Sequence, residues 1–454
     1  MIKAFENTAL CYPDRIAYVT DGRSISYKDL CNLAKEKANE LEAGVPVVLV
    51  GDKSIEYLSY ILACTMKGAP YIPVDPALPT ARKDALCLAV GKCKYIDCIS
   101  GEERFLDGEE CLLPKDCVYV IFTSGSTGAP KGVPITKENL ESFFSFINAI
   151  SPLSDYNACA VMNQASFSFD LSVADLYYAL GNGHTLVGAS RAYRENIALW
   201  LDALKSSGAK VCVVTPTFMR MCLLSKDFSR ENFPELDSVY FCGEVLGKPI
   251  VKKLWERFED LKIINAYGPT EATSAVSATL VTREDLDSEK PLPVGDMDSL
   301  ATKVEIIDGE IVLRGKSVFG GYLNVSSSAC RNENGENVYR TGDCGYTENG
   351  RLYCTGRLDS QIKYAGYRIE LGDIEENVRA AVGDADVAVV ALRDENGSVK
   401  KLRAFVVTGE GYTPEDIRNA LRERLPEYMM PQIIVTDKLP VNENSKLDVR
   451  RMSQ

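Results

Sequence analysis

Short β-branched runs alternate with amphipathic segments over the first two thirds of the chain, and no other sequence feature limits its fold as strongly. The short runs have the length of strands, and several are almost entirely apolar, as in strands buried on both faces. The sequence therefore predicts mostly parallel sheets covered by helices. The expected strands are Val47–Gly51, Val118–Thr123, Lys210–Thr215, Ser238–Cys242 and Lys262–Asn265, and the expected helices are Glu195–Ser206 and Ile250–Glu259.

The pattern changes after Pro291, where the extended runs become shorter and lie close together. Lys303–Ile307 and Glu310–Arg314 are separated only by Asp308 and Gly309, a pair that is typical of tight hairpin turns. We therefore expect a small and more antiparallel β unit in this region.

The last part of the chain has a compact pattern of its own. Thr413 is followed by Pro414 and, three residues on, by Asp416, an arrangement that is typical of a helix start. The expected elements are the helix Leu371–Val382, the strands Ala385–Leu392 and Leu402–Val407, and the helix Pro414–Leu425.

At 454 residues the chain is too long for one hydrophobic core. The predicted fold class is α/β, with a large N-terminal domain of mixed, mostly parallel sheets flanked by helices plus the small β unit. This domain is expected to span residues 1–357 and to hold the ligand site. Residues 358–454 are expected to form a small α+β C-terminal lid domain, and Asp359 lies at the junction.

Composition excludes several classes of function. The formal net charge is −13, with 64 acidic and 51 basic residues, which disfavours nucleic acid and anionic lipid as partners. No apolar run reaches the length of a membrane span, and the first residues lack the pattern of a signal peptide. None of the cysteines forms a C-x-x-C pair, so reduced thiols and a cytoplasmic location are expected. With His184 as the single histidine, the chemistry must come from positioning and charge.

The segment Thr123–Lys131 has the composition of an anion-binding loop. Glycines let the backbone approach an anion closely, hydroxyls add donors, and a lysine supplies positive charge. The spacing is not that of a Walker A loop, and a solvated turn is the alternative interpretation. The candidate residues are Thr123, Ser124, Gly125, Ser126, Thr127, Gly128 and Lys131.

A second candidate segment is Asn265–Glu271, which directly follows a predicted strand. Open α/β sheets bind ligands at the carboxyl ends of their strands. Tyr267 could stack on a base, Thr270 could donate to a phosphate, and Glu271 could hold Mg²⁺ through oxygen. The alternative is a β-turn with an exposed tyrosine.

Four further charged residues stand out along the chain. Asp170 lies within an apolar stretch, where it is either a satisfied core carboxylate or the partner of a ligand ammonium group. Asp343 is a candidate for accepting two ribose hydroxyls and Arg357 for a second nucleotide contact, although either could belong to a surface ion pair. Lys446 follows a polar turn and could simply be solvated.

Taken in order, these segments resemble the core motifs of the adenylate-forming superfamily, and specifically its amino-acid adenylation domains. The resemblance runs from Ile61–Pro76 (ILACTMKGAPYIPVDP) to Lys446. It implies that Thr123–Thr127 and Lys131 close over the β- and γ-phosphates of ATP and that Asp359 is the hinge of the lid. It also implies that Lys446 bridges the α-phosphate and the substrate carboxylate, with Lys446, Lys131 and Glu271 as the catalytic residues.

The resemblance assigns the remaining ligand contacts as well. Tyr267 would stack on adenine, Asn265 would contact the adenine edge, Asp343 and Arg357 would hold the ribose, and Glu271 would hold Mg²⁺. Asp170 would pair with the substrate ammonium group. Further contacts to ATP are expected from Gly243, Glu244, Ala266, Gly268 and Thr270, and further contacts to the amino acid from Leu171, Cys242, Gly268 and Ser274.

Three local runs resemble the D-alanine–D-alanyl carrier protein ligases in particular. They are FSFDLSVADLY (Phe167–Tyr177), TPTFMRMCL (Thr215–Leu223) and FCGEVL (Phe241–Leu246). In that family a cysteine at the position of Cys242 narrows the pocket beside the substrate methyl group. Ser274 and Ala174 depart from the pattern, because both are small or polar where an apolar or bulkier residue is expected. The pocket therefore leaves room for a slightly larger or hydroxylated substrate.

The resemblance implies ATP-dependent formation of D-alanyl-AMP with release of pyrophosphate, with ATP and Mg²⁺ as cofactors. The alanyl group then passes to the phosphopantetheine thiol of a separate carrier protein, for D-alanylation of teichoic acid. An adenylation enzyme for L-alanine, glycine or serine in peptide biosynthesis is the alternative. A non-catalytic sensor is disfavoured by the full set of charged residues, and a CoA ligase by Asp170. Neither nucleic acid nor membrane insertion is expected.

Overall fold

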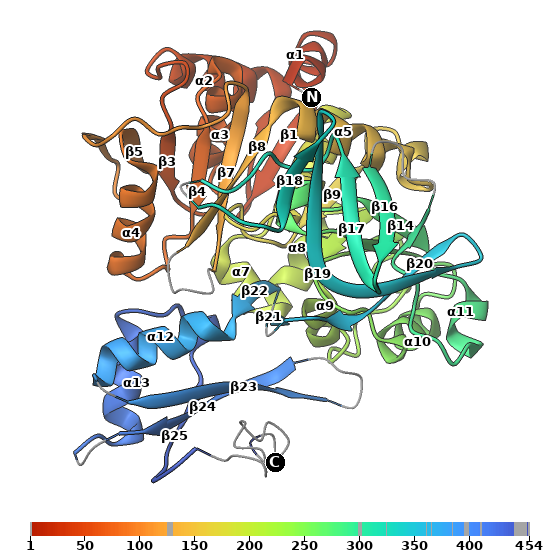
Figure 1. Ribbon diagram of the computed structural model, residues 1–454. Helices are drawn as coiled ribbons and strands as arrows, with labels where there is room; N and C mark the ends of the chain where they lie inside the picture. The colour runs from red at the N-terminus through yellow and green to blue at the C-terminus, as the bar shows by residue number, and fades with distance from the viewer. Residues whose placement is uncertain are drawn as a thin grey trace. The chain divides into compact units, whose positions relative to one another are not determined.

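The computed structural model describes residues 2–124, 130–297, 302–323, 325–359, 361–364, 366–383, 385–394, 399–408, 411–439 and 452 (Figure 1). The chain divides into two compact units. The first comprises residues 1–76, 90–121 and 132–358, and the second comprises residues 77–89, 122–131 and 359–454.

The largest sheet of the first unit has the strand order β14-β13-β12-β11-β9-β10-β1-β2. Its strands run parallel from β13 to β1, and antiparallel strands close both edges. The bounds are β1 Ile16–Thr20, β2 Arg23–Ser26, β9 Ala160–Asn163, β10 Thr185–Gly188, β11 Val211–Val214, β12 Ser238–Phe241, β13 Lys262–Tyr267 and β14 Ser277–Leu280.

A second sheet has the order β6-β5-β3-β4-β7-β8, with parallel pairing of β3 to β4 and β5 and of β4 to β7. The bounds are β3 Val47–Val50, β4 Tyr71–Val74, β5 Cys93–Asp97, β6 Glu102–Leu106, β7 Cys117–Thr123 and β8 Lys131–Thr136. These sheets confirm the predicted mostly parallel α/β architecture.

Helices cover both faces of the largest sheet, as period-two burial requires. Val211 and Val213 of β11 join one hydrophobic cluster, whereas Cys212 and Val214 join another together with Trp200 of α8. Helix α6 is buried along its whole length and packs on β9, β10 and β11. The bounds are α1 Ile2–Cys11, α2 Tyr27–Ala38, α3 Ile55–Lys67, α5 Lys137–Ala149, α6 Leu171–Gly181, α7 Arg191–Glu195, α8 Ile197–Ser207, α9 Pro216–Cys222, α10 Lys248–Arg257 and α11 Arg283–Asp287.

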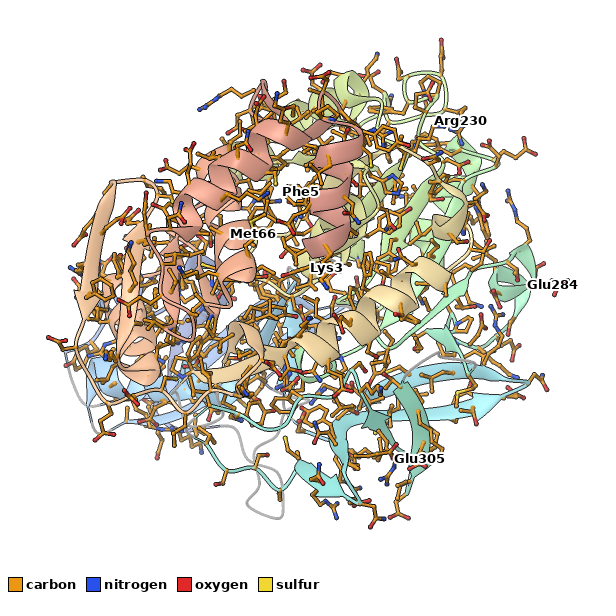
Figure 2. The ribbon with its side chains drawn as sticks, turned by 90° about the horizontal axis from the view of Figure 1, so that it is seen from above. Lys3, Phe5, Met66, Arg230, Glu284 and Glu305 are labelled. Atoms are coloured by element: carbon orange, nitrogen blue, oxygen red, sulfur yellow. The ribbon has the colours of Figure 1, made fainter. Side chains whose placement is uncertain are left out.

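The N-terminal helices pack on one another. Phe5 of α1 is fully buried where α1 meets α2 and α3 (Figure 2). Among the helices in the described part of the chain, none is sufficiently long and apolar to cross a membrane.

An antiparallel β unit completes the first unit, with the order β15-β20-β19-β17-β16 and β18 paired to β19. The turn at Asp308 and Gly309 has φ values of 52° and 80°, as the predicted hairpin turn requires. The bounds are β15 Gly295–Asp296, β16 Thr302–Ile307, β17 Glu310–Gly315, β18 Cys330–Glu333, β19 Glu336–Glu348 and β20 Arg351–Arg357.

The second unit contains residues 359–454 and also helix α4, Thr80–Val90, except for its last residue. Strands β23, β24 and β25 form a three-stranded sheet, and β21 and β22 form a two-stranded one. Arg82 of α4 pairs with the buried carboxylate of Asp373 on α12 at 2.8 Å. The bounds are β21 Gln361–Tyr364, β22 Tyr367–Glu370, α12 Leu371–Val382, β23 Asp386–Arg393, β24 Val399–Val407, α13 Pro414–Arg422 and β25 Gln432–Val435.

Candidate functional site

The segment Asn265–Glu271 forms the end of β13 and the short 3-10 helix η2, Thr270–Ala272. Gly268 between them has no room for a side chain, because a Cβ there would lie 2.5 Å from Cα of Ala275. Ser274 adopts a left-handed φ of 71°, and the preceding Thr273 does the same at 61°. The chain therefore reverses tightly at the carboxyl end of β13, where strained backbone is characteristic of functional sites.

Tyr267 is tied to the β unit through Asp343. The Tyr267 hydroxyl donates to Oδ2 of Asp343 at 2.6 Å, and Nη1 of Arg357 donates to Oδ1 at 2.5 Å. Burial and the Asp343 carboxylate raise the pKa of Tyr267, so its hydroxyl keeps the proton that it donates. Both Tyr267 and Asp343 are buried, which contradicts an exposed tyrosine in a turn. The fold thus gathers three predicted nucleotide residues in one hydrogen-bonded group.

Thr341 on β19 holds the Asp343–Arg357 ion pair in place through three hydrogen bonds. Thr341 donates its hydroxyl to Ile311 O at 2.7 Å and accepts the Asp343 N–H at 3.0 Å. Arg357 also donates to Thr341 O at 3.2 Å. Thr341 therefore orients both members of the Asp343–Arg357 ion pair from β19, and the sequence analysis missed this role.

Glu271 is fully buried, and Oε1 accepts the Tyr322 hydroxyl at 2.5 Å. The backbone carbonyl of Glu271 accepts the N–H of Phe319 at 2.8 Å, which joins η2 to the segment that carries Tyr322. A buried carboxylate is costly unless it is hydrogen-bonded, so the Tyr322 hydroxyl offsets part of the cost of burying Glu271. Sequence reasoning missed Tyr322, because a tyrosine after glycines carries no signal of its partner.

Asp170 precedes α6 and faces the segment of Glu271. Its Oδ2 accepts the Thr270 hydroxyl at 2.6 Å, and only 9% of Asp170 is exposed. The two residues come from sequence motifs that are 100 positions apart, and the fold brings them into direct contact. Leu171 and Ala174, both buried, follow Asp170 on α6.

Cys242 lies at the carboxyl end of β12 beside the turn of Ser274. Its Sγ lies 3.8 Å from Ser274 O, and both residues are buried. The hydroxyl of Ser274 has no hydrogen-bond partner among the described residues. A Cβ added at Gly243, which has a φ of 92°, would lie 3.8 Å from the Phe169 ring, so the runs around Asp170 and Cys242 adjoin.

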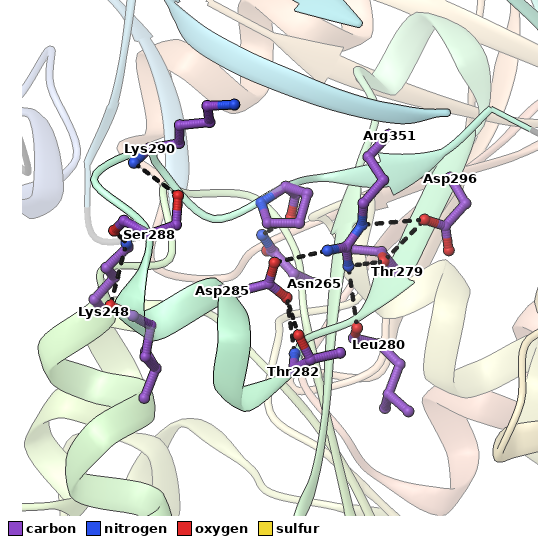
Figure 3. Close-up of polar contacts among 12 residues, drawn as sticks. Lys248, Asn265, Thr279, Leu280, Thr282, Asp285, Ser288, Lys290, Asp296 and Arg351 are labelled. Atoms are coloured by element: carbon purple, nitrogen blue, oxygen red, sulfur yellow. Dashed lines mark hydrogen bonds and ion pairs between the residues drawn. The ribbon is translucent and has the colours of Figure 1, made fainter. Parts of the chain in front are cut away.

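Two other predicted contacts have protein partners. Nδ2 of Asn265 donates to the carbonyl of Pro293 at 2.7 Å, in the same region where Arg351 ties β20 to β14 and α11 (Figure 3). Glu244 accepts the N–H of Thr217 at 2.8 Å near the start of α9. Ala266 lies between Asn265 and Tyr267 on β13 and is buried. Contact of these residues with ATP stays a prediction.

The remaining predicted residues belong to the second unit. Thr123 ends β7, Lys131 begins β8, and the Ser124 hydroxyl donates to Arg368 O and accepts from Glu370 N, each at 3.0 Å. Asp359 accepts the N–H of Gln361 at 3.1 Å, and its role as a hinge stays a prediction, as do the predicted domain limits at 357 and 358. Outside the described residues lie Gly125, Ser126, Thr127, Gly128 and Lys446.

Comparison with known proteins adds to this geometry. The family model described as AMP-binding enzyme matches residues 5–96 and 97–323, and the model described as AMP-binding enzyme C-terminal domain matches residues 373–446. A D-alanine–D-alanyl carrier protein ligase of Bacillus licheniformis is 33% identical, over 100% of this chain and 99% of the relative. A protein of the same name from Bacillus cereus is 34% identical, over 100% and 98%.

Solved structures share the fold. An NRPS protein containing adenylation and PCP domains has a TM-score of 0.84 at 25% identity, covering 99% of this chain and 83% of its own. A Vibrio cholerae adenylation domain in complex with glycyl-adenosine-5'-phosphate has a TM-score of 0.85 at 22% identity, covering 100% and 96%.

Proposed function

Because the chain belongs to the AMP-binding enzyme family, we propose that it activates D-alanine with ATP and loads it onto a carrier protein. The products of the first step are D-alanyl-AMP and pyrophosphate. The second step transfers the alanyl group to the phosphopantetheine thiol of a separate carrier protein and releases AMP. The curated relatives are named for this substrate and this acceptor, and the observation that carries the proposal is the buried Asp170–Thr270 contact.

The Asp170 carboxylate supports an amino acid as substrate. It is 9% exposed, and its Oδ2 accepts a hydrogen bond from the neutral hydroxyl of Thr270. A buried carboxylate is strongly stabilised by an ammonium group, and a D-alanine zwitterion carries one beside the carboxylate that must react. An acyl chain without an amino group would place apolar surface beside this carboxylate, which is unfavourable, so the site favours amino acids over simple carboxylic acids.

The nucleotide would be held by the Tyr267–Asp343–Arg357 group. The Asp343 carboxylate would accept both ribose hydroxyls, and its ion pair with Arg357 fixes its orientation. Tyr267 presents an aromatic face beside it for the adenine. Within the same proposal, Lys131 and the loop before it contact the β- and γ-phosphates, and Lys446 contacts the α-phosphate.

Mg²⁺ is expected to accompany ATP, and the donor chemistry fits it. Glu271 offers a carboxylate, the ligand type that Mg²⁺ prefers, and the Tyr322 hydroxyl donates to its Oε1. Among the described residues no cluster of three or more His, Cys, Asp or Glu side chains surrounds it. One protein carboxylate together with ATP phosphates is the usual way in which proteins hold this ion. When bound, it neutralises charge on the leaving pyrophosphate.

The chemistry requires alignment more than acid–base groups. The substrate carboxylate is already a nucleophile and attacks the α-phosphorus, while the bond to the β-phosphate oxygen breaks and pyrophosphate leaves. In the second step the thiolate attacks the carbonyl carbon of the mixed anhydride, and AMP leaves. The single histidine, His184, is fully buried beside Tyr178, and neither step requires an imidazole.

A second candidate substrate class is a small hydroxylated amino acid such as serine. The observation that favours it is the buried Ser274 hydroxyl, which lacks a hydrogen-bond partner in the described part of the chain and lies next to Cys242. An unsatisfied buried hydroxyl costs about 1–3 kcal/mol, so a substrate hydroxyl that pairs with it would be favoured.

Amino-acid-dependent ATP–pyrophosphate exchange with D-Ala, L-Ala, Gly, D-Ser and L-Ser tests the proposal. We expect the highest kcat/KM with D-alanine. A clear preference for L-alanine or glycine would refute the D-alanine assignment, and a preference for D-serine would support the second candidate. A cytoplasmic location belongs to the proposal, because ATP is the substrate and each of the fifteen cysteines, all within the described residues, carries a free thiol.

A further inference from the structure

A buried lysine, Lys53, holds the first residues of the loop that carries Asp170. Lys53 lies between β3 and α3 and is 1% exposed. Its Nζ donates to the carbonyl oxygens of Asn163 and Gln164, each at 3.0 Å. These carbonyls stand where β9 ends and the loop toward Asp170 begins, so the ammonium group of Lys53 fixes the first end of that loop.

The other end of the loop is tied to the same point. Nδ2 of Asn163 donates to Oδ2 of Asp175 at 2.6 Å, and Asp175 belongs to α6, which follows Asp170. The hydrogen bond spans twelve positions and closes the loop across its base. Lys53 also lies 5.7 Å from the ring centre of Phe167, inside the loop. Strand end, loop and helix start are thus joined through one buried polar group.

This group is expensive to bury. Burial raises the pKa of Asp175 to about 8 and lowers the pKa of Lys53, which shows that neither charge is well solvated. Oδ1 of Asp175 and Oδ1 of Asn163 have no hydrogen-bond partner among the described residues. Apolar side chains would fill the same space with less cost in stability, so a requirement other than stability is the better explanation.

The group of Lys53, Asn163 and Asp175 holds the loop that carries Asp170. The Asp170 carboxylate needs a fixed position if it is to meet an ammonium group while the substrate carboxylate stays in line with the α-phosphorus. We propose that Lys53, Asn163 and Asp175 are positioning residues that set the amino-acid affinity of the enzyme by holding the Asp170 loop at both ends. The inference rests on the proposed role of Asp170 and deepens it. Lys53 is buried and donates to the backbone at the start of the loop, so under this proposal it acts through Asp170.

Pyrophosphate exchange by Lys53→Met tests the proposal, since methionine keeps most of the side-chain length and removes the donors. We expect the KM for D-alanine to rise about 10-fold or more and the KM for ATP to change less than about 2-fold. Lys94→Met is the control, because Lys94 on β5 is also buried and donates to a backbone carbonyl, Glu40 O, at 3.3 Å. Lys94 lies opposite Val47, the first residue of β3, and pairs with Glu103 at 3.0 Å. Lys94→Met should lower the stability of the enzyme without raising the KM for D-alanine selectively.

The double variant Lys53→Met/Asp170→Ala shows whether Lys53 acts through Asp170. If it does, adding Lys53→Met to Asp170→Ala raises the KM for D-alanine no further. A multiplied effect in the double variant, or equal rises for both substrates in Lys53→Met, overturns the proposal. If Asp170→Ala alone leaves the amino-acid KM unchanged, the ammonium role under the proposed function has failed, independently of how Lys53→Met behaves.

If Lys53→Met does not fold, two variants of Asp175 test the same proposal. Asp175→Asn keeps an acceptor for the Asn163 amide, whereas Asp175→Ala removes it. We expect Asp175→Ala to raise the KM for D-alanine about 10-fold and Asp175→Asn to rescue most of that rise, with the KM for ATP constant in both. Equal amino-acid KM values for both variants and the parent enzyme would contradict the inference.

Discussion

Replacing His184 with asparagine should flatten the pH dependence of stability. His184 is 1% exposed, and its Nδ1 accepts the N–H of Cys159 at 3.3 Å, which only an unprotonated nitrogen can do. Burial, and to a smaller extent the Arg15 guanidinium, lowers the pKa of His184 from 6.5 to about 4. The unfolded chain therefore binds a proton between these values that the folded chain does not bind, and stability is lost as the pH falls through this window.

The size of the effect follows from the two pKa values. Between pH 7 and pH 5 the unfolded chain protonates His184, whose unfolded pKa is 6.5, while His184 in the folded chain stays almost unprotonated. The free energy of unfolding therefore falls by about 2 kcal/mol over this interval. Asparagine supplies an oxygen that can accept the Cys159 N–H and does not titrate in this range. The variant should therefore lose about 2 kcal/mol less than the parent over this interval.

Equilibrium urea denaturation at several pH values measures this difference. Asparagine also removes ring packing against Tyr178, so the variant is expected to be less stable at pH 7, and the readout is the slope with pH and not the absolute value. The chain has no other histidine, so no second imidazole contributes to the window. Equal slopes for the parent and the variant between pH 7 and pH 5 would show that His184 does not cause the loss of stability in this range.

Two further variants probe the site. Gly268→Ala should cost more than about 2 kcal/mol in denaturant unfolding and impair exchange, because its Cβ would lie 2.5 Å from a neighbouring backbone atom. Gly320→Ala, whose Cβ would meet nothing closer than 4.0 Å, is the control and should stay within about 0.5 kcal/mol; equal costs would contradict the geometry. Tyr322→Phe removes the donor to Glu271 and should raise the Mg²⁺ concentration for half-maximal exchange about 10-fold, and an unchanged requirement would count against Glu271 as the ligand.

Much of the fold was predictable from local patterns. The helix Leu371–Val382 has the predicted bounds, and the cap at Thr413 accepts the N–H of Asp416 as expected. The structure adds β25, Gln432–Val435, and the hairpin of β21 and β22, which the sequence analysis did not predict. Helix α13 ends at Arg422, before the expected Leu425. Strands this short lack the alternation needed to identify them, and their pairing depends on distant residues.

The site was predictable residue by residue but not contact by contact. Asp170 and Thr270 each belonged to a recognisable motif, yet only the fold places one on the other. Tyr322 and Lys53 gave no signal, since a single tyrosine or lysine in the sequence looks the same whether solvated or buried. Their roles depend on partners that lie 51 and 110 positions away, respectively.

Transfer to a carrier protein is the central claim, and intact-mass spectrometry tests it most directly. The enzyme is mixed with ATP, Mg²⁺, D-alanine and a phosphopantetheinylated D-alanyl carrier protein. We expect the carrier to gain the mass of one alanyl group only when ATP is present, and we expect carrier without phosphopantetheine to gain nothing. If the phosphopantetheinylated carrier stays unmodified under conditions in which D-alanine supports pyrophosphate exchange, the enzyme does not load this carrier.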